Sequence, residues 1–177
     1  MVAMVWINGS LRSAEEVGLS PFDHGITVGN GVFETLLASS GKPFAFTRHY
    51  RRLQRSAAAM GLSVRSAEEL WSASLEVLQA NELAGCRARL RITVTGGPAP
   101  LGSERGEEGE TTLVAASPTA EWGETEDVSI VPYTRNENGA LAGVKTTSYG
   151  ENVVAQAGRK GKGAGGAKIY KTKGEHF

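Results

Sequence analysis

One lysine, Lys145, stands apart from the other lysines and has a side chain that could do chemistry. It is the only lysine between Lys42 and Lys160, and it lies in residues 143–149, where a strand pattern runs into a polar turn. An unprotonated lysine amine attacks aldehydes and can hold a carbonyl cofactor as a Schiff base. The alternative is a solvated surface lysine, and the isolation of Lys145 by itself favours that alternative.

Other familiar kinds of site have weak support. The three histidines His24, His49 and His176 occur among many serines, but no G-x-S-x-G motif marks a nucleophile. The single cysteine, Cys86, and the scattered histidines show no metal-ligand spacing, so we expect no metal site. Residues 28–31 lack the third glycine and the following helix of a dinucleotide loop, and they are typical of a turn between strands.

Composition excludes several classes of partner. The chain has 177 residues, 40% of them hydrophobic, and 19 basic residues balance 19 acidic ones. Residues 158–177 hold six basic residues and one acidic residue, a net charge of +5, but no recognisable nucleic-acid motif. The N-terminus has neither a basic region nor an apolar run long enough for a signal peptide or a membrane span. We therefore expect a cytoplasmic protein that binds neither nucleic acid nor membranes.

The elements that must position Lys145 can be read along the chain. Asn8-Gly9 predicts a hairpin, because both central residues of a type I′ turn need positive φ. Thr47 is expected to cap a helix that Gly61 ends, and Ser66 with Glu69 forms a capping box for a second helix. Alternation predicts a half-buried strand over residues 87–95. Further strands are expected at residues 32–38, 111–116 and 128–133.

These elements predict an α+β fold. Its first part is a small N-terminal domain, residues 1–117, with an antiparallel sheet and two helices on one face. A linker is expected at residues 118–127, because this stretch is rich in acidic residues and contains Pro118. Residues 128–177 would begin a larger domain that carries Lys145. Six of the 23 glycines fall in residues 158–177, so we expect no stable helix there.

Five segments, taken in order, resemble the class IV aminotransferases. These are the fold type IV pyridoxal-phosphate enzymes, which include D-amino-acid and branched-chain aminotransferases and aminodeoxychorismate lyase. The likeness extends from about Trp6 to Val154. The segments are Asp23-His24-Gly25, Gly29-Asn30-Gly31-Val32-Phe33-Glu34-Thr35, His49-Tyr50-Arg51-Arg52-Leu53, residues 89–97, and Lys145-Thr146-Thr147-Ser148-Tyr149.

The resemblance implies roles for individual residues. Lys145 resembles the lysine that forms the Schiff base with pyridoxal 5'-phosphate and then moves the proton between the substrate and the cofactor. Arg52 resembles the arginine that binds the cofactor phosphate, and the alternative is a solvated helix arginine among Arg48, Arg51 and Arg55.

Further residues resemble the surroundings of the cofactor. Tyr149 resembles the tyrosine near its phenolic oxygen, although that tyrosine lies one place later in the branched-chain enzymes. Phe33 and Glu34 resemble pocket-wall residues. Arg89 and Arg91 lie on the polar face of their predicted strand and are candidates for binding a substrate carboxylate.

The sequence also departs from the family pattern. Asn30 stands where aspartate is common. Residues 172–175 resemble the turn just before the glutamate that pairs with the pyridine nitrogen, and that glutamate would fall beyond Phe177. We therefore expect the sequence to be an incomplete record of a longer enzyme.

The resemblance implies a homodimer that transfers the α-amino group of a small amino acid to a 2-oxo acid. The alternative within the family is 4-amino-4-deoxychorismate lyase, which releases pyruvate and 4-aminobenzoate from an amino-chorismate substrate. A non-catalytic domain that retains the family fold is a further alternative.

Overall fold

The computed structural model describes residues 2–121, 123–125, 128–160 and 166–171. It divides into two compact units, one made of residues 1–120 with Val144–Thr147 and the other of residues 121–143 and 148–177. The architecture is the expected α+β fold. The predicted linker at 118–127 includes residues outside the described part, as does the turn at 172–175. Among the described residues, no helix combines the length and apolar character needed to cross a membrane.

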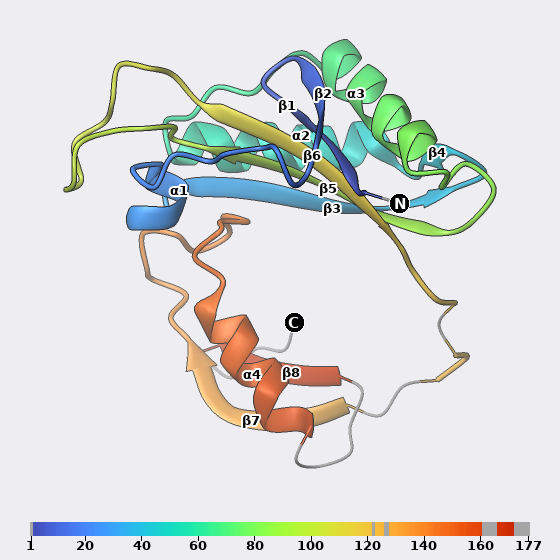
Figure 1. The fold of residues 1–177 in the computed structure, drawn as a ribbon. Coiled ribbons are helices and arrows are strands. Elements are labelled where there is room, and N and C mark those ends of the chain that lie inside the picture. Colours follow the sequence, from blue (N-terminus) through green and yellow to red (C-terminus); the bar gives the residue numbers. More distant parts are fainter. Residues whose placement is uncertain (1, 122, 126–127, 161–165, 172–177) are drawn as a thin grey trace. The chain divides into compact units, whose positions relative to one another are not determined.

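A six-stranded antiparallel sheet forms the centre of the first unit (Figure 1). Its spatial order is β2-β1-β6-β5-β3-β4. The strands are β1 (Met4–Ile7), β2 (Ser10–Ser13), β3 (Gly31–Ser39), β4 (Lys42–Pro43), β5 (Ala88–Thr95) and β6 (Thr111–Pro118). The hairpin predicted at Asn8-Gly9 joins β1 to β2, and both turn residues have positive φ, 46° and 99°.

Three helices belong to this unit: α1 (His24–Thr27), α2 (Phe46–Ala59) and α3 (Ala67–Ala80). The capping box is confirmed for α3, because the Ser66 hydroxyl accepts the amide N–H of Glu69 at 3.1 Å. The prediction that Thr47 caps α2 is wrong. Ala45 precedes the helix in the left-handed conformation with φ 52°, and no side chain caps this end.

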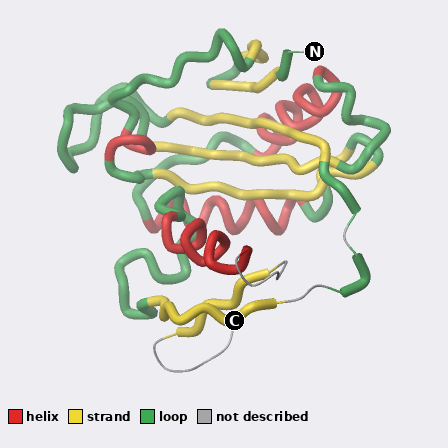
Figure 2. Tube along the Cα trace, turned by 60° about the horizontal axis from the view of Figure 1, so that its bottom comes forward, coloured by secondary structure: helices red, strands yellow, loops and turns green. Residues whose placement is uncertain are grey.

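The core lies between one face of the sheet and helices α2 and α3, which cover the same side of it (Figure 1 and Figure 2). The alternation predicted for β5 is confirmed, with Leu90, Ile92 and Val94 buried against the helices. In β3, Val32 and Leu36 point into the same core. Residues between them in the register, such as Phe33 and Thr35, therefore belong to the opposite face.

Strand β3 has a partly free edge, which receives the segment Val144–Thr147. Strand β4 pairs only with Ala38 and Ser39, so the beginning of β3 has room for another partner. Val32 bridges to Thr146, and the amide N–H of Thr147 donates to the Gly31 carbonyl at 2.8 Å. This pairing fixes the backbone on both sides of Lys145.

The second unit contains β7 (Val128–Arg135), α4 (Gly150–Lys160) and β8 (Gly166–Lys171). Strands β7 and β8 pair in parallel, so the chain must cross over between them, and α4 lies in that connection. The expectation of no stable helix from Gly158 onward is wrong as far as Lys160, where α4 ends. Sequence analysis did not predict β8.

Candidate active site

Lys145 is attached to the first unit through its backbone and its side chain. Its amide N–H donates to the hydroxyl of Ser56 on α2 at 3.2 Å, and its carbonyl accepts the N–H of Phe33 at 3.1 Å. Its half-buried side chain brings the Nζ atom to 4.2 Å from the centroid of the Phe33 ring. The lysine amine therefore lies at the edge of β3, over an aromatic surface.

The same ring contacts a second cation. The Cζ atom of Arg91 lies 3.7 Å from the Phe33 ring centroid. In the register of β3 and β5, Arg91 faces Thr35, while Arg89 faces Leu37, two residues farther from Phe33. The structure thus brings Lys145, Phe33 and Arg91 together, and it places the exposed Arg89 farther along the strand.

Glu34 lies on the other face of β3, next to helix α2. Its carboxylate is fully buried and accepts a bidentate pair of hydrogen bonds from Arg52, Nε to Oε1 at 2.5 Å and Nη2 to Oε2 at 2.6 Å. The Nδ1 atom of His49 lies 2.7 Å from Oε2. Phe33 and Glu34, both expected in a pocket wall, therefore point to opposite faces of the sheet.

The electrostatics of this cluster favour ionisation of both partners. Burial opposes the charge on Glu34, but hydrogen bonds from Arg52 and His49 outweigh it and lower the pKa of the carboxyl below 4.5. The hydrogen bond to Glu34 raises the pKa of Arg52. The cluster is thus an ion pair with a histidine attached to it.

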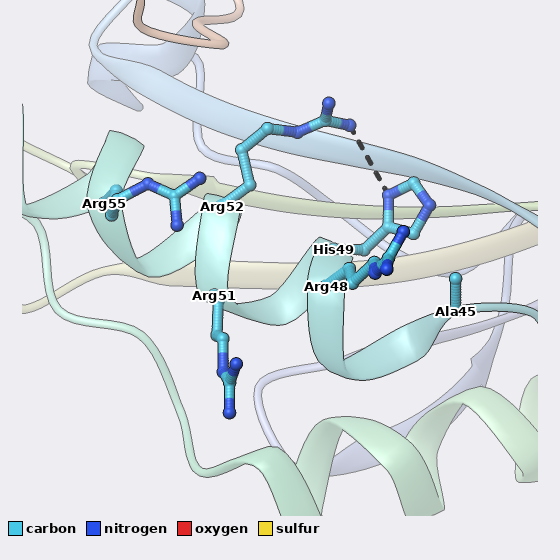
Figure 3. Close-up of a pocket in the computed structure, with 6 residues that line it drawn as sticks. All are labelled: Ala45, Arg48, His49, Arg51, Arg52 and Arg55. Atoms are coloured by element: carbon cyan, nitrogen blue, oxygen red, sulfur yellow. Dashed lines mark hydrogen bonds between the residues drawn. The ribbon is translucent and has the colours of Figure 1, made fainter.

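Helix α2 presents a basic pocket beside this ion pair (Figure 3). Figure 3 shows Arg52 and His49 projecting together, whereas Arg51 points away from them. The pocket is lined by Ala45, Arg48, His49, Arg51, Arg52 and Arg55. Such a concentration of guanidinium groups favours anions.

Two residues that take part in these contacts, His49 and Ser56, receive no role from the sequence alone, although His49 lies within a family motif. Their positions relative to Arg52, three before and four after, put all three along one side of a helix. The spacing could therefore have grouped His49 and Ser56 with Arg52. It could not have predicted their partners, which are Glu34 for His49 and the Lys145 amide for Ser56.

The segment Asp23-His24-Gly25 has a structural role. The Asp23 carboxylate accepts the amide N–H of Gly25 at 2.7 Å and the hydroxyl of Thr95 at 2.9 Å. The buried His24 ring lies 3.0 Å from the carbonyl of Pro100 through Nε2. These contacts tie the loop before β3 to the loop after β5.

Tyr149 belongs to the second unit, where it directly precedes helix α4. Its carbonyl accepts the amide N–H groups of Asn152 and Val153 at 3.1 and 3.2 Å, which starts helix α4. The Arg135 guanidinium pairs with Asn152 and with Glu151 of the same helix. Within the described residues, no group of three His, Cys, Asp or Glu side chains could hold a metal ion.

Curated proteins similar to this chain catalyse two different reactions. The aminodeoxychorismate lyase of Bacillus subtilis is 33% identical over 95 residues, which are 53% of this chain and 32% of the relative. The D-alanine aminotransferase of Staphylococcus aureus is 35% identical over 80 residues, 45% of this chain and 28% of the relative. The chain therefore spans about a third of the length of these relatives.

Solved structures share the fold over nearly the whole chain. The branched-chain amino acid aminotransferase of Escherichia coli matches with a TM-score of 0.86 at 21% identity, covering 98% of this chain and 61% of that one. A hypothetical aminotransferase from Mycobacterium tuberculosis, in a form with α-ketoglutarate and PMP bound, matches with a TM-score of 0.78 at 22% identity. That match covers 97% of this chain and 63% of the other. These likenesses show the α+β architecture of fold type IV aminotransferases.

A family model described as amino-transferase class IV matches residues 31–175, from the start of β3 to beyond β8. This range includes Lys145 with its contacts Phe33 and Arg91, and it includes the cluster of Glu34, His49 and Arg52. This match covers more than half of the chain, and the chain therefore belongs to the class IV aminotransferase family.

Proposed function

We propose that this chain carries the cofactor-binding lysine of a pyridoxal-phosphate enzyme that transfers the α-amino group of a small amino acid to a 2-oxo acid. The observation that carries the proposal is the position of Lys145. Its amine and the Arg91 guanidinium both contact the Phe33 ring, and its backbone is hydrogen-bonded to α2, the helix that holds Arg52. Enzymes of this family use pyridoxal 5'-phosphate.

The residues present fit that cofactor. When bound, pyridoxal phosphate supplies an aldehyde for amines and a ring that accepts electrons from the bond broken at the substrate Cα. Lys145 offers the amine, and Arg52 offers a guanidinium suited to a phosphate monoester. We assign the covalent attachment to Lys145 and the phosphate to Arg52.

The remaining steps need a proton carrier and a carboxylate site. Lys145 would be the proton carrier at the substrate Cα, because its backbone is held in place by Ser56 and Phe33. Arg91, on the same aromatic ring, binds the substrate carboxylate. We assign Arg89 a supporting role in that carboxylate site and Tyr149 a position near the phenolic oxygen of the cofactor.

Two wider features belong to the same proposal. We propose that residues 1–117 form the small domain and residues 128–177 begin the larger one, with 118–127 as the linker, although the segment Val144–Thr147 belongs to the first compact unit. We also propose a homodimer, as the resemblance to the family implies.

Aminodeoxychorismate lyase activity is the second candidate. It is favoured by the 33% identity to the lyase of Bacillus subtilis, which is close to the 35% identity to D-alanine aminotransferase. Both reactions begin with proton removal by a lysine, so Lys145 serves either one. Formation of pyruvate and 4-aminobenzoate from aminodeoxychorismate, without glutamate from an amino acid plus 2-oxoglutarate, would support the lyase.

Cofactor attachment is the direct test. The chain is mixed with pyridoxal phosphate, reduced with borohydride to make the link permanent, and digested for peptide mapping. We expect the label on Lys145 and its loss in Lys145→Ala, whereas Lys42→Ala keeps it. A label on another lysine would refute the assignment. A chain that takes up no cofactor would favour the non-catalytic alternative.

A further inference from the structure

We propose that Glu34 is a positioning residue whose buried carboxylate fixes the guanidinium of Arg52 for binding a phosphate monoester. The inference rests on the proposed function, because the phosphate in question is that of the cofactor. It adds to the machinery of the site a residue on the face of β3 that packs against α2, opposite the face of Phe33. Three features support it: the N–H groups that Arg52 keeps available, the contact of His49, and the cost of burying Glu34.

The donor count leaves Arg52 able to bind an anion while it is paired. A guanidinium has five N–H groups, and Glu34 uses the one on Nε and one on Nη2. Three N–H groups remain, two on Nη1 and one on Nη2. The Arg52 side chain is 48% exposed, whereas that of Glu34 is 1% exposed. The Glu34 carboxylate thus holds the Nε and Nη2 edge of the guanidinium, and the remaining N–H groups on Nη1 and Nη2 stay accessible.

His49 fixes the carboxylate in turn. With Glu34 ionised, the 2.7 Å contact requires a proton on Nδ1 of His49, which donates to Oε2. The 3.5 Å contact between His49 Nδ1 and Arg52 Nη2, dashed in Figure 3, then lies between two donors. Both donors therefore converge on Oε2 of Glu34, and neither side chain can rotate without losing its bond.

Stability alone gives little reason for this ion pair. Val32, Leu36 and Ala38 occupy the same face of β3 and are buried in the apolar core. An ion pair with a buried member is often no more stabilising than apolar residues of similar volume, because the buried charge, here that of Glu34, must be desolvated. A carboxylate at this position is explained if Arg52 must be held in one orientation. An arginine held in this way has already lost the rotamer freedom that binding would otherwise remove.

The decisive variant is Glu34→Gln, which keeps the shape but loses the charge and the bidentate geometry. We expect affinity for pyridoxal phosphate and for inorganic phosphate to fall about fivefold. Affinity for pyridoxal, which has no phosphate, should stay unchanged. Glu69→Gln is the matched control, because it removes another arginine–glutamate pair, with Arg65, from the same unit. In an Arg52→Lys background, Glu34→Gln should add little.

A second measurement follows the Nε–H signal of Arg52 by NMR, assigned through Arg52→Lys. In the wild-type chain, inorganic phosphate should shift this signal, and Glu34→Gln should weaken that response. If Glu34→Gln unfolds, the wild-type titration still decides, since a signal unmoved by phosphate refutes the proposal. Phosphate affinity that stays equal or rises in a folded Glu34→Gln variant also refutes it, because the carboxylate would then be neutral or compete with the phosphate. Binding of inorganic phosphate at Arg52 without uptake of pyridoxal phosphate would refute the proposed function and leave the role of Glu34 standing.

Discussion

The amide N–H of Lys145 donates a hydrogen bond to the hydroxyl of Ser56, which lies 89 residues earlier in the chain. Ser56 is on the buried side of α2, one helical turn after Arg52. One helix therefore positions both the lysine segment and the guanidinium proposed to bind the phosphate. The segment that carries Lys145 is itself outside any helix or strand, and it is held by Ser56 of α2 and by the edge of β3.

Ser56→Ala should destabilise the fold. The substitution removes the acceptor of the Lys145 amide at a site where Ser56 is 3% exposed. An unsatisfied buried donor costs about 1 to 3 kcal/mol, so the free energy of unfolding in urea should fall by that amount. Ser72→Ala, at an exposed position of α3, should change it by less than about 0.5 kcal/mol. Equal effects of the two substitutions would show that the bond contributes nothing.

Gly31→Ala should loosen the segment that carries Lys145. A Cβ atom at Gly31 would lie 2.8 Å from Oγ1 of Thr147 and 3.1 Å from the carbonyl of Val94. Thr147 would have to move, and its amide would lose the bond to the Gly31 carbonyl. We expect a loss of about 1 to 3 kcal/mol in stability. Faster hydrogen exchange at Thr147 would locate the change, and Gly85→Ala, which has open space around its Cβ, is the control.

Local patterns predicted much of this architecture. The alternation of residues 87–95 predicted β5, and Asn8-Gly9 predicted the first hairpin, because both depend on neighbours in sequence. Strand β8 was missed for the same reason. Its first residue, Gly166, lies in a glycine-rich stretch with low strand propensity, and the strand forms through pairing with β7.

The clusters on β3 were only partly predictable. Counting by two from Val32 places Glu34 on the buried face, so a charged residue in the core was visible in the sequence. Its partners were not, because Arg52 reaches Glu34 only once α2 packs on the sheet. Propensity also could not place the start of α2, where Ala45 takes a left-handed conformation that its side chain does not favour.

Arg52 and Arg51 should differ in phosphate binding although they are adjacent. Arg52→Lys keeps the charge but loses the planar fork, so affinity for pyridoxal phosphate should fall about tenfold. Arg51→Lys should leave that affinity unchanged, because Arg51 points away from the cluster (Figure 3). Fluorescence titration with the cofactor measures both. Equal losses would indicate a diffuse basic surface on α2 and no specific clamp.

Acid should weaken the fold partly through Glu34. Its pKa lies below 4.5 in the folded chain, because hydrogen bonds from Arg52 and His49 outweigh burial. The folded state therefore binds fewer protons than the unfolded state, and this stabilisation is complete above pH 4.5 and lost as the pH falls through the lowered pKa. Unfolding in urea at a series of pH values should show a shallower acid decline for Glu34→Gln. A decline of unchanged slope would assign the effect to other groups, such as Glu110, whose pKa is also lowered.

Arg91 and Arg89 should differ in their effect on substrate binding, because they lie at different distances from Phe33 along β5. They share one face of β5, but only Arg91 contacts the ring that also meets the Lys145 amine. A guanidinium there can hold a substrate carboxylate close to the reacting carbon, and a charge-assisted hydrogen bond of this kind contributes about 1.5 to 3 kcal/mol. Arg91→Gln should therefore weaken binding of an amino acid or a 2-oxo acid by about 10- to 100-fold. Arg89→Gln should change it by less than about threefold, as measured by the perturbation of the cofactor absorption on addition of substrate.

A primary amine with the same side chain but no carboxylate distinguishes carboxylate binding by Arg91 from general damage to the site. Its affinity should be the same in wild type and in Arg91→Gln. A larger loss from Arg89→Gln would place the carboxylate farther along β5 and remove Arg91 from the site.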